Sequence, residues 1–374
     1  MVSIKKAFQS GNRYAVGVKW DSTDPSPILR RWFMAGGYEQ DINFDANPFN
    51  HLYPWKGMIR ETRADDGSLI AQFGDPSYTE DGTNGQVVVP ILSHYYRVWR
   101  DSDGQMIMAI SPWPLNGFKR HPIGIDNLGN IKPKVFVGAF EGVAQKIADD
   151  TYHEDPDYNA GDPSEAPEQL DPALYKLCSV AGYKPKAQQN MADFRTMADN
   201  RGSSYALCRT VDHCALQMLF YIEFASLNSQ SALGQGIVSK TSGPPANNSE
   251  PTDSNHGLWS YNPTTPSYGI TTDGLHAMVY RGIENLWGNL WKWLDNYIVH
   301  IDGYYDGTGK APSDTASGYK HIAVLPLGHD GYTYNYFKDI VNHPDMDWGF
   351  WPSELGGASN NYFCDYHLSY NPSG

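Results

Sequence analysis

Apolar and polar positions alternate along the first third of the chain, which is the pattern of strands that bury one face. Residues 85–101 (GQVVVPILSHYYRVWRD) are rich in β-branched and aromatic residues and predict a strand or a bent pair of strands. A turn at residues 101–104 leads into a further strand, residues 105–110, and the same scheme recurs around the Asp-Gly pair at residues 66–67. Residues 135–142 (VFVGAFEG) predict one more strand, whose glycines allow close backbone approach or a bulge.

Helical spacing replaces this alternation in the middle of the chain. Residues 187–202 have apolar residues near helical spacing, and the pattern stops at Gly202. Residues 213–227 (HCALQMLFYIEFASL) are apolar nearly all round, which predicts a buried helix with Asp212 as its N-cap. Glu223 within that helix must find a partner or reach the surface.

The order of these elements is strands first, then two helices, then loops and further strands. Residues 145–172 and 228–280 are rich in loop-forming residues and have no period, so they predict long surface loops. The sequence therefore predicts an α+β fold in which helices pack against a mainly antiparallel sheet. We expect a β-rich domain over residues 1–134 and a second domain over residues 135–374.

The stretch RGIENLWGNLWKWLDNYIV, residues 281–299, places three tryptophans at nearly alternating positions around a Gly-Asn pair. Read as a strand with a period of two, these rings would lie on one side and form an aromatic core layer between sheet and helices. A solvent-facing platform for sugars is the alternative that the pattern leaves open. The residues expected to form the structural core here are Glu284, Asn285, Trp287, Asn289, Trp291 and Trp293.

Composition narrows the classes of partner. The chain has 374 residues, of which 40% are hydrophobic, 13% aromatic and only 19% charged, so it can bury a sizeable core. Its net charge of −14 would repel nucleic acid and anionic membrane surfaces. No apolar run approaches the roughly 20 residues of a membrane span, and the first residues lack an apolar signal core. We therefore expect a protein made in a cytoplasm, with no membrane insertion.

The four cysteines match neither a zinc pattern nor a disulfide framework, which favours reduced and mostly buried thiols. They are Cys178, Cys208, Cys214 and Cys364. A bridge between Cys178 and Cys208, or between Cys214 and Cys364, is left open by the sequence.

Motifs that would indicate catalysis are missing from the sequence. It contains no GxGxxG after a strand, no GxxxxGK[ST], no GxSxG and no HExxH. Asp302 and Asp306 sit in a glycine-rich stretch that is typical of a simple turn, although calcium binding is the alternative. Among 42 acidic residues some pair always looks suitable for acid–base chemistry, so that signal decides nothing.

Several segments, spread over most of the chain, resemble one group of proteins in the same order. YPWKGMIRETRADDGS, DGTNGQVVVPILSHYYRV, NGFKRHPIG and VFVGAFEG resemble the upstream half of that group, and FRTMADNRGSSY with DHCALQMLFYIEFASLNSQSALGQGI resembles its paired helices. RGIENLWGNLWKW resembles its core signature, and FWPSELGGASNNYFCDYH resembles the lead-in to its final strands. The group has the C-type-lectin-like fold of phage tail-fibre and receptor-binding proteins, which the formylglycine-generating-enzyme group shares.

The resemblance implies a virion protein of a bacterial virus. Residues 1–134 would serve virion attachment or assembly, and residues 135–374 would be the C-type-lectin-like domain. It implies a tail-fibre or tail-tip adhesin that binds a host surface receptor, either a glycan or a protein. Other virion subunits would be its partners, and its state would be a homo-oligomer, for example a trimer. The expected ligand-binding residues are in the aromatic tail: Trp348, Trp351, Tyr362, Tyr366 and His367.

One departure from the resembled group lies at the end of the chain. The group continues beyond the segment matching residues 362–374 into a Gly- and Trp-rich stretch, whereas this sequence stops at Gly374. Either the sequence is cut short, or a neighbouring chain completes the sheet, or the binding face is lost. The last case would leave a purely structural baseplate, head-fibre or decoration protein. The copper-binding cysteine pair of the enzyme group belongs to the missing part, so neither enzymatic activity nor a metal or cofactor is expected.

Overall fold

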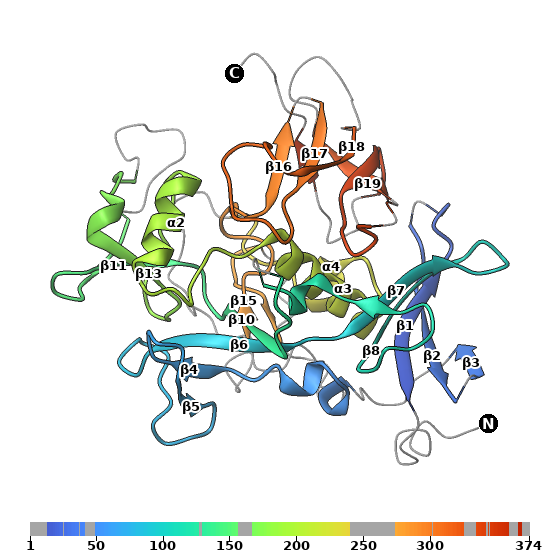
Figure 1. Cartoon of the computed structure of the whole chain (residues 1–374), viewed down its shortest axis with the longest axis horizontal. Coiled ribbons are helices and arrows are strands. Elements are labelled where there is room, and N and C mark those ends of the chain that lie inside the picture. Colours follow the sequence, from blue (N-terminus) through green and yellow to red (C-terminus); the bar gives the residue numbers. More distant parts are fainter. Residues whose placement is uncertain are drawn as a thin grey trace.

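Antiparallel strands are the commonest regular elements of the described chain, and three α-helices accompany them (Figure 1). The computed structural model describes residues 13–24, 26–36, 38–41, 49–126, 129–155, 167–239, 274–300, 302–324, 334–341, 343, 345–358 and 366–368. The helices are α2 (Met191–Asp199), α3 (Thr210–Phe224) and α4 (Ser229–Leu233). Every pairing between the named strands of these ranges is antiparallel, so the predicted α+β class with mainly antiparallel sheets is confirmed.

The largest sheet is built by the N-terminal part of the chain and has the order β3-β2-β1-β8-β7-β9. Its strands are β1 (Tyr14–Trp20), β2 (Arg30–Ala35), β3 (Tyr38–Asp41), β7 (Tyr95–Arg100), β8 (Met106–Ser111) and β9 (Lys119–Arg120). The hairpin predicted between β7 and β8 is confirmed. Its turn is held by the carboxylate of Asp101, which accepts hydrogen bonds at 3.0 Å from the backbone N–H groups of Asp103 and Gln105.

A second sheet has the order β10-β6-β4-β5. Its strands are β4 (Glu61–Arg63), β5 (Leu69–Gln72), β6 (Gln86–Leu92) and β10 (Lys134–Gly138). The predicted turn between β4 and β5 is present, with Gly67 in the left-handed region at φ 82° and its N–H bonded to Ala64 O at 2.8 Å. Strands β6 and β7 are the bent pair that residues 85–101 predicted, and the bend sends them into different sheets.

Four smaller sheets follow, with the orders β12-β11-β13, β14-β15, β16-β17-β18 and β20-β19-β21. Their strands are β11 (Val143–Lys146), β12 (Tyr152–His153), β13 (Tyr175–Cys178), β14 (Val279–Tyr280), β15 (Ile283–Glu284), β16 (Tyr297–His300), β17 (Gly303–Asp306), β18 (Lys320–Ala323), β19 (Tyr334–Ile340), β20 (Pro352–Leu355) and β21 (Tyr366–Leu368). In Figure 1, β16 to β19 stand together at the top, while β11, β13 and α2 lie together at one side.

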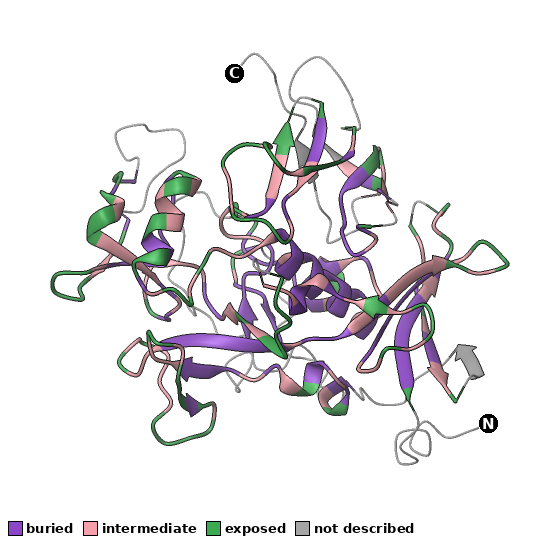
Figure 2. Cartoon of the chain, in the orientation of Figure 1, coloured by how far each residue is buried: buried purple, intermediate pink, exposed green. Residues whose placement is uncertain are grey.

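Helix α3 is the centre of the hydrophobic core, which agrees with the prediction of a buried helix from residues 213–227. Apart from His213 and Phe224, all of its residues are buried. It packs on β1 and β8, and its side chains share one apolar cluster with residues from β6, from residues 278–287 and from residues 337–351. Figure 2 shows the helix as a buried element with the sheets around it. Its all-round apolar surface is therefore explained by cover on every side.

The predicted start of α3 was wrong by three residues. The helix begins at Thr210, and Asp212 occupies the third helical position rather than the N-cap. From there its carboxylate accepts a hydrogen bond at 3.1 Å from the backbone N–H of Arg209, and it pairs with the guanidinium of Arg209 at 2.6 Å. An acidic residue in the first turn also complements the positive end of the helix dipole, so the same residue type suits both positions.

The partner that Glu223 requires is Arg281. Their side chains are each only 1% exposed; Arg281 Nε donates to Glu223 Oε2 at 3.0 Å, and Arg281 Nη2 donates to Glu223 Oε1. A third hydrogen bond runs from Arg281 Nη1 to Asn50 Oδ1 at 2.7 Å. The buried charges are thus paired in two-pronged geometry, which is the arrangement that low-dielectric surroundings demand.

Two further sequence predictions concern the cysteines and the domain boundary. Cys178 and Cys208 are free thiols, so the bridge between them is not formed; Cys214 is buried, and Cys364 lies outside the described residues. The division at residues 134 and 135 stays a prediction; it falls at the start of β10, which pairs with β6. None of the helices in the described ranges is both long and apolar enough to cross a bilayer.

Candidate functional site

The chain from residue 281 to residue 296 repeatedly enters the left-handed backbone region, which asparagine and glycine tolerate better than other residues. The residues with positive φ are Arg281, Gly282, Asn285, Gly288, Asn289 and Asn296. Such residues interrupt regular strand geometry, so β15 is the one named strand within this segment, and the rest consists of turns, bends and irregular chain with an isolated bridge at Asp295. The predicted strand through the three tryptophans is therefore wrong.

One carboxylate, that of Glu141 between β10 and β11, fastens this segment. Its Oε2 accepts hydrogen bonds from Asn289 Nδ2 and, at 3.1 Å, from Asn285 Nδ2. Its Oε1 lies 2.9 Å from Lys292 Nζ, and the side chain of Glu141 is 7% exposed. A carboxylate so buried needs partners, and these three come from residues 285–292.

Trp287 occupies the core, as predicted. It is 8% exposed, meets the ring of Phe220 edge to face at 5.4 Å, and donates from Nε1 to Gly234 O at 3.2 Å. The next two residues hold the chain against the segment after α4. Asn289 N–H donates to Ile237 O at 2.7 Å, and a side chain at Gly288 would meet Ile237 N at 2.8 Å.

Trp291 and Trp293 lie on the surface. Trp291 is 89% exposed and Trp293 is 53% exposed, and the side chain of Lys292 between them turns to Glu141. Trp293 Nε1 donates to Gln189 O at 3.1 Å, just before α2. Trp291 makes no hydrogen bond or ring contact with any residue that the structure describes. We call Trp291, Lys292 and Trp293 the tryptophan ledge.

The prediction that Trp291 and Trp293 belong to the aromatic core layer is wrong. The chain is held at Asn289 on one side and at Asp295 on the other, where Asp295 N–H donates to Cys208 O at 2.9 Å and Thr210 N–H donates to Asp295 O at 2.9 Å. The residues between these anchors bridge two packed parts of the molecule across its surface. Sheet alternation does not apply to such a bridge, so the period-two reading failed after Trp287.

The tryptophans expected to bind a ligand are instead in the core. Trp348 is 2% exposed and Trp351 is 3% exposed; their rings meet edge to face at 5.1 Å. Trp348 also faces His121 at 6.1 Å, and Trp351 stacks on Tyr297 at 6.0 Å. Both rings belong to the same buried apolar cluster as α3, so the prediction that they contact a ligand is wrong.

The other predicted site residues lie in or near the core, or their side chains lie outside what the structure describes. Glu284 and Asn285 are 3% and 1% exposed, as expected for the structural core, whereas Asn289 is half-buried. Tyr362 lies outside the described residues. Tyr366 and His367 belong to β21, which pairs with β19, and their backbone alone is described.

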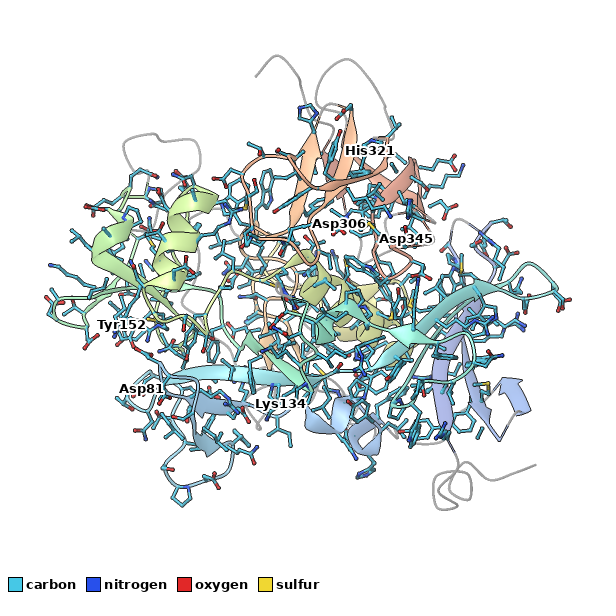
Figure 3. All side chains as sticks on the ribbon, viewed as in Figure 1. Asp81, Lys134, Tyr152, Asp306, His321 and Asp345 are labelled. Carbon is cyan, nitrogen blue, oxygen red and sulfur yellow. The ribbon has the colours of Figure 1, made fainter. Side chains whose placement is uncertain are left out.

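A second polar cluster lies on the surface of β16 to β18, in the upper part of Figure 3, where His321 is labelled. Asp302 binds His300 Nδ1 at 2.6 Å and accepts from the hydroxyl of Tyr305 at 2.7 Å. These hydrogen bonds lower the pKa of the Asp302 carboxyl. Asp306 accepts from Thr308, so the two aspartates do not converge on one point. In the described part of the chain, no group of three or more His, Cys, Asp and Glu side chains is placed to hold a metal ion.

Comparison with known proteins does not place the chain in a family. No protein-family model matches the chain, and no curated protein matches it significantly. The geometry of the tryptophan ledge alone therefore makes it the candidate site. The sequence offered one signal for it: a lysine between two tryptophans is unusual inside a core, because its charge would need a buried partner.

We expect Gly288→Ala to lower the free energy of unfolding by about 1–3 kcal/mol, since φ is 81° and the new Cβ would press on Ile237 N. Gly309→Ala is the matched control: φ there is 76°, but no atom lies within 4 Å of the added Cβ. Urea unfolding of both variants separates the clash from the backbone strain. If both variants lose the same free energy of unfolding, the contact of the new Cβ with Ile237 does not contribute to the loss.

Proposed function

We propose that the chain is a virion protein of a bacterial virus, a tail-fibre or tail-tip adhesin that binds a host surface receptor non-covalently. In this proposal the tryptophan ledge is the contact surface. The protein works in the virion with other subunits and as a homo-oligomer, for example a trimer, because repeated weak sites gain avidity when they are linked. No catalytic step, cofactor or nucleic-acid partner is part of the proposal.

The observation that carries this proposal is the exposure of two indoles on a fixed loop. An isolated protein gains nothing from leaving a ring like that of Trp291 in water, since its burial would be favourable by about 25 cal/mol per Å². Exposed tryptophan is typical of surfaces that meet a partner, where it contributes large contact area at low entropic cost. The ledge is also held in place before binding, by Glu141 on one side and by Gln189 on the other.

The sequence resemblance supports the virion part of the proposal. The segment that resembles the lectin-fold signature, residues 281–293, is the segment that forms the left-handed turns and carries the ledge. A mainly antiparallel α+β fold with one buried helix, α3, is consistent with a C-type-lectin-like domain over residues 135–374. The ligand surface proposed here differs from the tail residues named from sequence, because Trp348 and Trp351 are buried.

We expect the full chain, labelled with a fluorophore, to adsorb to some strains in a panel of Gram-negative and Gram-positive bacteria. Trp291→Ala should reduce the adsorbed protein by about tenfold or more, if its ring contributes about 1–3 kcal/mol, as an aromatic ring stacked on a nucleic-acid base does. Its thermal midpoint should not change, since the ring is 89% exposed.

Ile131→Ala is the control for that experiment, because Ile131 is 63% exposed and lies outside the ledge. It should adsorb like the unmodified chain. Adsorption that is indifferent to Trp291→Ala, or no adsorption to any strain, would remove the proposal.

A purely structural virion component is the second candidate, and the edge strand β5 favours it. Leu69 and Ile70 on β5 are 51% and 42% exposed, and β5 is the last strand of its sheet. An apolar edge strand can pair with a neighbouring subunit. A density map of the assembled virion in which other subunits cover both the tryptophan ledge and β5 would support this candidate over the adhesin.

A further inference from the structure

We infer that the tryptophan ledge binds a neutral oligosaccharide, with a sugar ring stacked on Trp291 and a second sugar against Trp293. This inference rests on the proposed adhesin function and names the class of its receptor. It is carried by three properties of the ledge: the free indole face, the local charge balance and the division of hydrogen-bonding groups.

The indole face of Trp291 suits a pyranose ring. A pyranose has a flat apolar face of C–H groups and a rim of hydroxyl groups, so it needs an open aromatic plane with polar groups nearby. Trp291 is 89% exposed, and its neighbours Lys292 and Asn289 are polar and anchored to Glu141. The tightest contacts of protein partners usually lie in dry pockets within an interface of about 1,000 Å² or more. A ring that stands alone among polar groups fits a sugar better.

Charge favours a neutral glycan over an acidic one. The only cation of the ledge, Lys292, lies 2.9 Å from Glu141, so the ledge carries no free positive charge for a carboxylate or sulfate. The chain as a whole carries −14, which repels polyanions over the distance of a Debye length. A polyanionic capsule or teichoic acid would therefore approach unfavourably.

The two indoles have different parts in the binding. Trp293 already donates its Nε1 hydrogen to Gln189 O, so only its ring is available. Trp291 has no such partner among the described residues, and its Nε1 hydrogen is free for a sugar hydroxyl. Arg195 fixes the far end of the loop, with Nε 2.7 Å from Asp295 Oδ1, so little ordering is left to be done on binding.

The test titrates the full chain with hexasaccharides and follows tryptophan fluorescence and calorimetric heat. The neutral probes are maltohexaose, cellohexaose and mannohexaose, and the acidic probe is a hexamer of galacturonic acid. We expect saturable binding of at least one neutral probe and none of the acidic probe. Trp291→Ala should weaken Kd about tenfold or more and Trp293→Ala by less, while Ile131→Ala leaves it unchanged.

The outcomes separate this inference from the adhesin proposal. If no neutral probe binds, or if Trp291→Ala binds as well as the unmodified chain, the sugar site is overturned. If cell adsorption still depends on Trp291 in that case, the adhesin stands with a receptor that is not a neutral glycan. If a neutral probe binds through Trp291 but no strain adsorbs the chain, the sugar site stands and the adhesin proposal falls.

Discussion

Glu223→Ala is expected to lower the free energy of unfolding by about 3–5 kcal/mol, because it leaves the guanidinium of Arg281 buried without its counter-charge. Both side chains are 1% exposed, so the guanidinium lies away from bulk water and depends on its protein partners. Asn50 would still accept one hydrogen bond from Arg281, but it has no charge to offer. Urea unfolding followed by circular dichroism should show a lower midpoint with the same slope.

The matched control is Glu354→Ala, which removes the acidic partner of Lys338. Those two side chains are 56% and 45% exposed, and an ion pair so open to water contributes at most about 1 kcal/mol. If both alanine variants lost the same free energy of unfolding, burial would not explain how much the Glu223–Arg281 ion pair stabilises the fold.

Acid should destabilise the fold between pH 6.5 and pH 4 through two buried imidazoles. His94 and His121 are both 0% exposed, and their rings lie 5.0 Å apart. Burial lowers the pKa of His94 to about 4, and burial together with the nearby His94 and Arg209 lowers the pKa of His121 well below its usual value. The unfolded chain therefore binds more protons in this window. The stability is fully present above pH 6.5 and falls as the pH is lowered, by about 2 kcal/mol at pH 5 for His94, with a further loss in the same direction from His121.

The variant that isolates this effect is His94→Asn with His121→Asn. Asparagine can keep the local hydrogen bonds, in which His94 Nδ1 bonds Leu92 O at 3.0 Å and His121 Nδ1 accepts from Ile123 N–H at 3.2 Å, but it does not titrate. Unfolding midpoints measured from pH 7.5 to pH 4.5 should fall more steeply for the unmodified chain than for the variant. Parallel curves would contradict the assignment of acid sensitivity to these two residues.

Local patterns predicted the elements whose partners are near in sequence. The hairpin of β7 and β8 and the turn between β4 and β5 follow from alternation and turn residues alone. Helices α2 and α3 follow from the spacing of apolar residues. The position of Glu223 within an apolar helix indicated that its carboxylate needs a partner. The sequence could not say that the partner is Arg281, because that pairing depends on the backbone fold of residues 281–296.

The ledge escaped prediction for a physical reason. Whether Trp291 faces the core is decided by the left-handed turns at Gly288 and Asn289, and each of them changes the direction of every later side chain. Trp348 and Trp351 were misplaced in the opposite sense, since their cover comes from Tyr297 and His121, which lie far away in sequence. Aromatic content alone does not separate a binding surface from a core.

The burial of α3 has a consequence for synthesis on the ribosome. The last cover of the helix includes Phe350, whose ring meets Tyr221 edge to face at 5.1 Å. Translation at 5–20 residues per second delivers Phe350 roughly 6–25 s after the end of the helix has been made. During that interval an apolar segment is displayed to the cytosol with one side bare. We therefore expect the nascent chain to depend on a chaperone, or on early docking to β1 and β8, until residues 337–351 emerge.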